Sequence, residues 1–312
     1  MLMERRLLVV MSVALGATAL LAVGPSIVKI SDLPEARFVL WRLVLAAVFY
    51  GLISMASGDR PSRSELRHAL WGGLVFAVNL VFFVAAMRRT SAANAVAIGA
   101  LQPVVLLGLA GPLFGERPRR ALYGWSLLAI GGVAVAMYGS EGDGVATRFG
   151  DLLALVGMLL FCLYYVVSKR ARTEVGSVSY QLGLTVVAAL VMVPVALVSG
   201  HGVAPPSGGD WWPVALMALI PGTGHLLINY AHAHVPLALM GLINLLFVAL
   251  VPFYAWWLVG EASGGLLVVG VGLVIATLAL VLAPPGAKSA PTCAPDGPTH
   301  ITNTPAPCRV QT

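Results

Sequence analysis

The chain has 312 residues, of which 59% are hydrophobic and only 10% charged, and its mean hydropathy is +0.90. This composition excludes a soluble protein, because a soluble fold of this size needs a polar exterior that the chain cannot supply. The formal net charge is +6, but the basic residues gather at the ends of apolar segments, which indicates membrane topology and not a nucleic-acid-binding face.

Apolar segments long enough to cross a bilayer, about 20 residues each, follow one another along the chain. Ten are predicted, at residues 7–29, 36–56, 68–87, 91–113, 121–139, 149–168, 178–199, 212–231, 236–258 and 264–283. The first follows Arg5-Arg6 but is too long for a signal peptide, so we predict a membrane helix there. Residues 284–312 are rich in Pro, Thr and Ala, and we predict a disordered cytoplasmic tail.

Lysine and arginine are divided unequally between the two sides of the membrane. If the N-terminus is cytoplasmic, the inside segments hold 13 of the 19 basic residues, the outside segments hold 5, and Arg42 lies within a span. Cytoplasmic loops carry an excess of Lys and Arg. The count therefore predicts that both termini are cytoplasmic.

The chain also carries an internal repeat. A shift of 145 residues places Gly115-Glu116 on Gly260-Glu261, and each half then holds five apolar segments. Because five is odd, the second half must be inverted relative to the first. We predict an all-α integral membrane protein of ten transmembrane helices in two inverted five-helix repeats, at residues 1–140 and 149–283. Inverted repeats are typical of secondary transporters.

Four local patterns carry a family resemblance. They are LPEARFVLWRLVLA in the second segment, AAMRRTSAANAVAI between the third and fourth, LQPVVLLGLAGPLFGE in the fourth, and Gly131-Gly132 in the fifth. With them the chain resembles the drug/metabolite transporter superfamily, and specifically its EamA-type members with ten helices, over about residues 7–283. The second half departs from the pattern, since Val187 stands at the position that matches Arg42.

The resemblance implies a secondary transporter in the cytoplasmic membrane, and we expect it to be an exporter. It implies alternating access for small metabolites or drug-like molecules through a central cavity between the two repeats. The expected partners are the lipid bilayer, a small-molecule substrate and either a proton or a counter-substrate, with the protein as a monomer or homodimer. No cofactor is expected.

Arg42 is the only strongly charged residue well inside a predicted span. A charge at that depth costs several kcal/mol unless it is paired or hydrated, about 3 on insertion scales. One interpretation is a cavity-lining group that faces a substrate carboxylate or phosphate. The alternatives are a side chain that extends to the outer surface and a structural anchor for carbonyl groups of a neighbouring helix.

Uncharged polar residues inside the predicted spans must find partners where water is absent. The predicted substrate-binding set, with Arg42 included, is Arg42, Asn79, Gln102, His225, Asn229 and Asn244. His225 and Asn229 are four residues apart and so share one helix face. The alternative is hydrogen bonding between helices, worth about 0.6 kcal/mol per bond. His225 also suggests proton coupling, against the alternative of a buried neutral histidine.

Other chemistry finds little support. His232 and His234 are close in sequence, but no acidic or cysteine partner lies near them, so no metal site is expected. No catalytic motif is present, so we predict that the protein is not an enzyme; the alternative is a polytopic membrane enzyme that acts on a lipid-linked substrate.

Glu116 and Glu261 close matching segments, and we expect them to cap a helix or pair at an interface. Small residues at the start of the fourth segment predict that the fourth and ninth segments form the contact between the halves.

Overall fold

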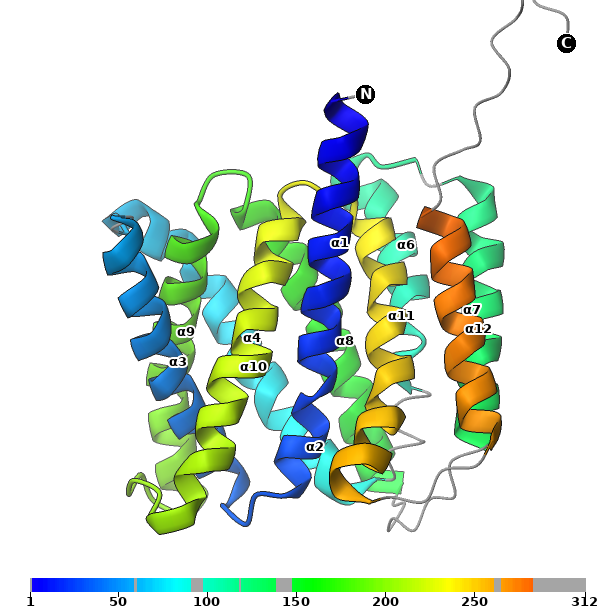
Figure 1. The fold of residues 1–312 in the computed structure, drawn as a ribbon. Coiled ribbons are helices and arrows are strands. Elements are labelled where there is room, and N and C mark those ends of the chain that lie inside the picture. The colour runs from blue at the N-terminus through cyan, green and yellow to red at the C-terminus, as the bar shows by residue number, and fades with distance from the viewer. Residues whose placement is uncertain are drawn as a thin grey trace, which may run out of the picture. The chain divides into compact units, whose positions relative to one another are not determined.

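The computed structural model describes residues 2–58, 61–90, 98–117, 119–138, 148–260 and 265–282. Every regular element in these ranges is helical (Figure 1). The helices are α1 (Leu2–Ala22), α2 (Gly24–Lys29), α3 (Glu35–Ser57), α4 (Arg63–Arg89), α6 (Gln102–Phe114), α7 (Arg120–Tyr138), α8 (Arg148–Ala171), α9 (Ser177–Val198), α10 (Trp211–His232), α11 (Leu237–Tyr254) and α12 (Gly265–Leu282), with a 3₁₀ turn at Gly208–Asp210 and a π-helical turn at Ala255–Val259.

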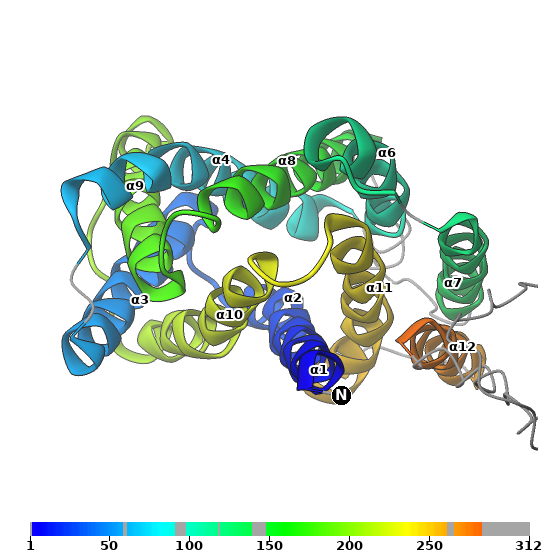
Figure 2. The same ribbon diagram turned by 90° about the horizontal axis from the view of Figure 1, so that it is seen from above.

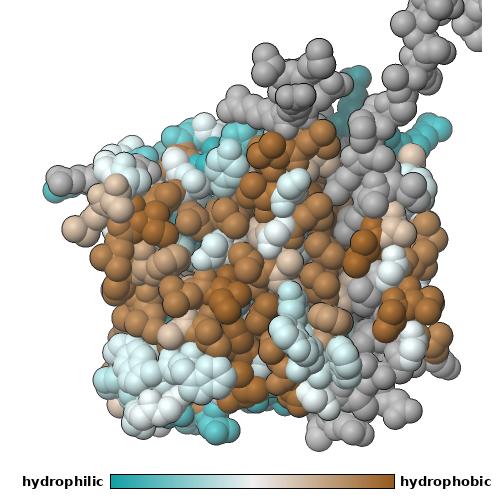
Figure 3. All heavy atoms as spheres, in the orientation of Figure 1, coloured by the Kyte–Doolittle hydropathy of each residue, from teal (hydrophilic) through white to brown (hydrophobic). Residues whose placement is uncertain are grey.

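Seven helical stretches in the described residues are long and apolar enough to cross a membrane. The apolar helices Gln102–Phe114 and Val268–Thr277 are shorter, and the predicted start of the fourth segment, residues 91–97, lies outside the described residues. The predicted tail at 284–312 also lies outside them. In the view of Figure 3, hydrophobic residues dominate the middle of the visible face, and hydrophilic ones gather toward its two ends. The chain is therefore an integral membrane protein.

The first predicted span is not one continuous helix. It divides at Val23 into α1 and α2, and Pro25 occupies the first turn of α2. Proline has no backbone N–H, and its ring clashes with the carbonyl group four residues earlier, which kinks or breaks a helix, and here the helix breaks. The predicted span at 7–29 corresponds to the candidate membrane span Leu8–Lys29, and its helix is interrupted at Val23.

One end of the helix bundle, called here the α2 end, collects the residues around α2. Arg88 in α4 donates from Nη2 to the carbonyl oxygens of Ser31 (3.2 Å) and Leu33 (2.7 Å). Beyond α4, the hydroxyl of Thr90 donates to the carboxylate of Asp151 in α8 (2.5 Å). The end of α4 and the starts of α3 and α8 therefore lie together at the α2 end.

The link between α9 and α10 lies at the same end. Arg37 donates to the carbonyl oxygens of Ala204 and Pro205, both at 3.1 Å, and the Trp41 indole also donates to Ala204 (3.0 Å). Trp41 further contacts Trp211 edge-on, with ring centroids 5.5 Å apart. These contacts fix the start of α10 beside the start of α3.

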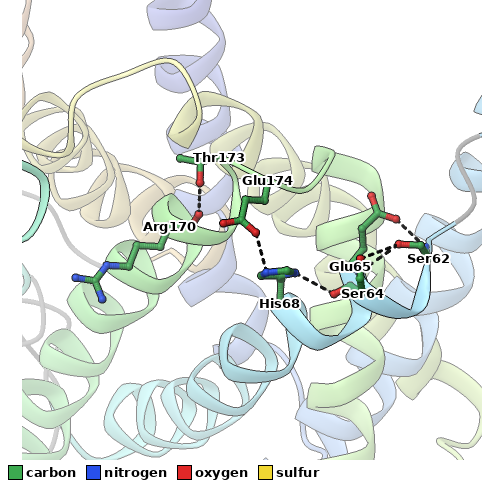
Figure 4. A network of polar contacts seen from close by, with 7 residues as sticks. All are labelled: Ser62, Ser64, Glu65, His68, Arg170, Thr173 and Glu174. Carbon is green, nitrogen blue, oxygen red and sulfur yellow. Dashed lines mark hydrogen bonds and ion pairs between the residues drawn. The ribbon is translucent and has the colours of Figure 1, made fainter.

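The opposite end, where α1 begins, is called the α1 end. There Lys169 at the end of α8 donates to the carbonyl oxygen of Val235, between α10 and α11 (2.8 Å). His68 near the start of α4 pairs with Glu174, in the link that follows α8, at 2.8 Å (Figure 4). Each long helix thus runs between these two ends.

Helices of the first half pack mainly on helices of the second. The contacting pairs include α1 with α10, α3 with α9, α4 with α8 and α9, and α6 with α11 (Figures 1 and 2). Glycines permit the closest approaches: a Cβ on Gly73 would lie 2.6 Å from the carbonyl oxygen of Leu184, and one on Gly224 would lie 2.9 Å from that of Ala17. The predicted contact of the fourth and ninth segments is present as α6 against α11, but it is only one part of the interface.

Candidate functional site

A cavity of about 120 Å³ lies between the helices of the two halves. It is lined from α1, α2, α3, α4, α6, α8, α10 and α11, and mostly by apolar side chains. Five of the six predicted site residues line it, namely Arg42, Asn79, Gln102, His225 and Asn244. Residues far apart in sequence therefore meet at one cavity that is large enough for several water molecules or a small metabolite.

The cavity occupies the half of the bundle nearer the α2 end. Its lining residues in α4 fall between Asn79 and Met87, close to the end of that helix. Those in α8 fall between Ala154 and Phe161, in the first half of that helix. Since α4 ends and α8 begins at the α2 end, no part of the lining from these helices reaches the α1 end.

Arg42 is buried in the cavity wall. Its side chain is in α3, seven residues and so about 10 Å from the start of that helix, and the residue is 3% exposed. Nη1 has no hydrogen-bond partner, and none of the ion pairs found in the described residues involves Arg42. The interpretation of a side chain that extends to the outer surface is therefore wrong: the guanidinium remains inside and faces the cavity.

Two further polar groups in the lining have unused hydrogen-bonding capacity. Asn244 donates to the side-chain oxygen of Gln102 (2.5 Å), which leaves the Gln102 amide nitrogen without a partner. Nδ1 of His225 also has none, although its ring contacts the Phe76 ring edge-on at 4.8 Å. Asn79, by contrast, donates to the carbonyl oxygen of Gly157 (2.8 Å). Buried polar groups normally find partners, and unpaired ones also occur away from the cavity, at Ser26, Asn229 and His232. What sets Arg42, Gln102 and His225 apart is that they line the cavity.

Asn229 is the one residue of the predicted set that lies outside the cavity lining. It shares a face of α10 with His225, but it lies one turn closer to the α1 end, is fully buried and does not line the cavity. Its amide nitrogen donates to the Tyr164 hydroxyl (2.8 Å) and to the Gln181 side-chain oxygen (2.5 Å). Its backbone carbonyl accepts from Nε of Arg172 (2.8 Å). Asn229 thus joins α8, α9 and α10 in place of contacting the cavity.

Sequence reasoning missed the residues that surround Asn229. Tyr164, Tyr180 and Gln181 are each at most 1% exposed, and the Tyr180 hydroxyl lies 3.0 Å from that of Ser168. Arg172 follows α8, outside the membrane-spanning stretch, and burial lowers the pKa of its guanidinium. A polar residue within a span was the only available signal, and it does not distinguish a cavity wall from a packed core.

Replacing Asn229 with leucine should destabilise the protein without altering the cavity lining. The substitution removes the donor to Tyr164 and Gln181 and leaves buried polar atoms unpaired, at about 1–3 kcal/mol. We expect a lower melting temperature of the purified protein in detergent. Leu219→Ala on the same helix is the control, because Leu219 is 46% exposed on the lipid-facing surface. Equal melting temperatures for Asn229→Leu and wild type would contradict the assigned role.

The α1 end is closed by a group of contacts centred on Glu116, called here the Glu116 cluster. One carboxylate oxygen of Glu116 accepts from the backbone nitrogen of Leu237 (2.7 Å), and the other accepts from that of Ala238 (3.2 Å). Lys169 lies 3.4 Å from the same carboxylate and also binds the carbonyl oxygen of Val235. Glu116 therefore caps α11 where the helix dipole is positive, in agreement with the predicted structural role.

The described residues contain no group of three or more His, Cys, Asp or Glu side chains that would hold a metal ion. The two residues considered for such a site differ in placement. His232 is buried against the Tyr165 ring at 4.6 Å, whereas a ring nitrogen of His234 lies 3.0 Å from the carbonyl oxygen of Tyr230. The structure does not bring them together around a common point.

Residues 8–138 and 148–283 each match the family model described as the EamA-like transporter family. The chain belongs to the EamA-like transporter family. The predicted resemblance is confirmed, and the two matched stretches lie on either side of residues 139–147. A search of curated proteins finds no match.

The fold of this EamA-like chain also occurs in a solved crystal structure. The two align with a TM-score of 0.72 at 19% sequence identity, over 89% of this chain and 96% of the other. Identity at this level shows a shared fold and nothing about shared substrates. The family match and the apolar helices together show a multi-pass membrane protein of the transporter type.

Proposed function

We propose that the protein is a secondary transporter that exports a small metabolite or drug-like molecule across the cytoplasmic membrane by alternating access. The observation that carries this proposal is the cavity in one half of the bundle, in whose lining Arg42, Gln102 and His225 each have a buried polar atom without a partner. The other half is closed by the Asn229 contacts and the Glu116 cluster. A site confined to one half of the bundle, with the other half closed, is what one state of an alternating-access cycle requires.

Ten helices in two inverted repeats, at residues 1–140 and 149–283, are part of this proposal. The first helices of the two halves run in opposite directions. α1 and α2 run toward the α2 end, whereas α8, the first helix of the second half, begins at that end and runs away from it. The contacts also match in pairs, since α1 with α10 and α8 with α4 exchange under a two-fold relation between halves. Gly115 and Gly260, at equivalent positions, both end helices with positive φ, at 64° and 77°, a conformation that glycine adopts without strain.

The orientation follows from charge. The segments predicted to be inside, such as those around Arg63 and Lys169, lie at the α1 end, and those predicted outside, such as the one around Arg88, lie at the α2 end. By the positive-inside rule the α1 end is cytoplasmic. The cavity then faces the outside, and the Glu116 cluster lies on the cytoplasmic side.

A bulky residue in the cavity wall should stop transport. Ala154 lines the cavity, and the adjacent Leu155 does not and is 37% exposed. Purified protein would be reconstituted into liposomes with a labelled panel of amino acids, organic acids, nucleosides and cationic drugs. We expect at least one compound to cross faster than in empty liposomes, and this flux to be lost in Ala154→Trp because the indole fills the cavity.

Leu155→Trp is the matched control, since it adds the same side chain on the lipid-facing surface of the same helix. It should transport as wild type does. Melting temperatures report that both variants are folded. If folded wild-type protein moves no compound of the panel, or if Ala154→Trp and Leu155→Trp transport equally, the proposal fails.

A further inference from the structure

We propose that the cavity selects an organic monoanion: a molecule with one carboxylate group and an apolar body about the size of an aromatic ring. This inference rests on the proposed function in one respect, because it takes the same cavity as the substrate site. It goes further by naming the chemistry that the site recognises and the chemistry that it rejects.

The first step concerns charge. Within the described residues, Arg42 is the only charged side chain in the lining, and no aspartate or glutamate lines the cavity. A guanidinium that is 97% removed from solvent and has an unpartnered Nη1 is costly unless an opposite charge compensates it. A ligand carboxylate would supply that charge, and arginine matches a carboxylate in shape and hydrogen bonding.

The second step concerns hydrogen-bond donors. The bond from Asn244 occupies the side-chain oxygen of Gln102, so what Gln102 offers the cavity is its NH₂ group. His225 offers the unpartnered ring nitrogen Nδ1. Both residues are more than nine-tenths buried, at 2% and 7% exposed. A carboxylate is a pure acceptor with several lone pairs, and so it satisfies the guanidinium donors from α3 and the amide donors from α6 together, and a donor from α10 in the tautomer of His225 that carries its proton on Nδ1.

The third step concerns what the cavity rejects. An ammonium group needs a carboxylate partner, whereas the remaining acceptors in the described lining are uncharged amide oxygens such as that of Asn79. It would also be repelled by Arg42, and the repulsion is strong where water is excluded. The rest of the wall is apolar, with Phe83, Phe161 and Phe247 among its members. A monoanion with an apolar body therefore fits better than a zwitterion of the same shape, and a cation fits worst.

The test uses four probes of one shape: 3-phenylpropionate, phenylalanine, 3-phenylpropionamide and 3-phenylpropylamine. A ligand that binds the folded state raises its melting temperature, so affinities follow from melting curves of the purified protein in detergent at increasing probe concentration. We expect 3-phenylpropionate to bind about 10- to 100-fold more tightly than the amide, the range for hydrogen bonds that involve a charged group. Phenylalanine should bind more weakly than 3-phenylpropionate, and the amine should not bind.

Arg42→Gln should abolish the preference for 3-phenylpropionate over 3-phenylpropionamide, and Arg42→Lys should retain part of it. Arg63→Gln removes the same charge from an exposed position at the start of α4 and should leave the preference unchanged. If Arg42→Gln does not fold, the wild-type order of the four probes decides alone. The inference is overturned if the amide or the amine binds as tightly as the carboxylate, if none of the four binds, or if folded Arg42→Gln keeps the preference.

Flux in liposomes separates this inference from the proposed function. Carboxylate-selective binding without flux of any compound would support the monoanion site and contradict the transporter. Flux of a cation that 3-phenylpropionate does not inhibit would support the transporter and contradict the monoanion site.

Discussion

Replacing Glu116 with alanine is expected to loosen the α1 end of the bundle. The variant loses the acceptor for two backbone N–H groups at the start of α11 and leaves Lys169 without its carboxylate. The two side chains are only 16% and 15% exposed. Breaking such a mostly buried, charge-assisted set should cost about 2–4 kcal/mol of the state in which this end is closed.

The measurement is the accessibility of a cysteine beneath the Glu116 cluster. Val235 is 1% exposed, so Val235→Cys, in protein without its native cysteines, should resist a membrane-impermeant maleimide. Adding Glu116→Ala should make it reactive at a temperature where the protein remains folded. Within the proposed cycle, this change represents a shift toward the state open at the α1 end.

Glu174→Ala is the matched control for Glu116→Ala. Glu174 also forms an ion pair at the α1 end, with His68, but its side chain is 65% exposed and that of His68 is 42% exposed (Figure 4). Exposed ion pairs contribute about 0–1 kcal/mol, so the Val235→Cys labelling rate should stay unchanged. Equal rates for Glu116→Ala and Glu174→Ala would show that the Glu116 cluster does not close this end.

Gly73→Ala is expected to be a strongly destabilising methyl addition to α4. The new Cβ would lie 2.6 Å both from the carbonyl oxygen of Leu184 and from Cβ of Val187 in α9. Backbone cannot move aside as a flexible side chain does, so α4 and α9 must separate, at a cost of about 3 kcal/mol. The check is the melting temperature in detergent together with the fraction of monodisperse protein after purification.

Gly51→Ala provides the comparison, because a Cβ at Gly51 in α3 meets nothing within 4 Å. Alanine favours the helix over glycine by roughly 0.5–1 kcal/mol, so this variant should be as stable as wild type or slightly more so. If Gly73→Ala and Gly51→Ala have the same melting temperature, α4 and α9 are not in close contact.

Apolar length predicted much of this fold. The predicted segment 178–199 corresponds to α9 at Ser177–Val198. A single apolar segment in lipid can pair all its backbone N–H and C=O groups only by forming an α-helix. The break at Val23 was harder to foresee, since Pro25 lies near the end of its segment and the segment's hydropathy does not change there. Local chemistry, and not average composition, decided that detail.

The sequence predicted which polar residues gather around the cavity, and their binding of a substrate stays a prediction. Charge or polarity inside a span identified Arg42, Asn79, Gln102, His225 and Asn244, all of which line the cavity. Polarity alone did not separate Asn229 from them. Asn229 lies only one helical turn beyond His225 on α10, yet His225 lines the cavity and Asn229 lies in the packed core.

The asymmetry between the halves has a similar origin. Val187, at the position that matches Arg42, lies at the contact of α9 with Gly73. Only the packing of the two helices could reveal that this position has no access to the cavity.

The pairing of helices across the halves has a consequence for biosynthesis. α1 leaves the ribosome first, yet it packs against α10, which begins at Trp211. Until α10 has been synthesised, the surface of α1 around Ala17, which packs against Gly224 in the folded protein, must face lipid or an insertion chaperone. Such long sequence separations slow folding. The first half, made alone, therefore lacks the partners that would hold its helices in place, and we expect truncated chains to be degraded in the cell while full-length chains assemble late and all at once.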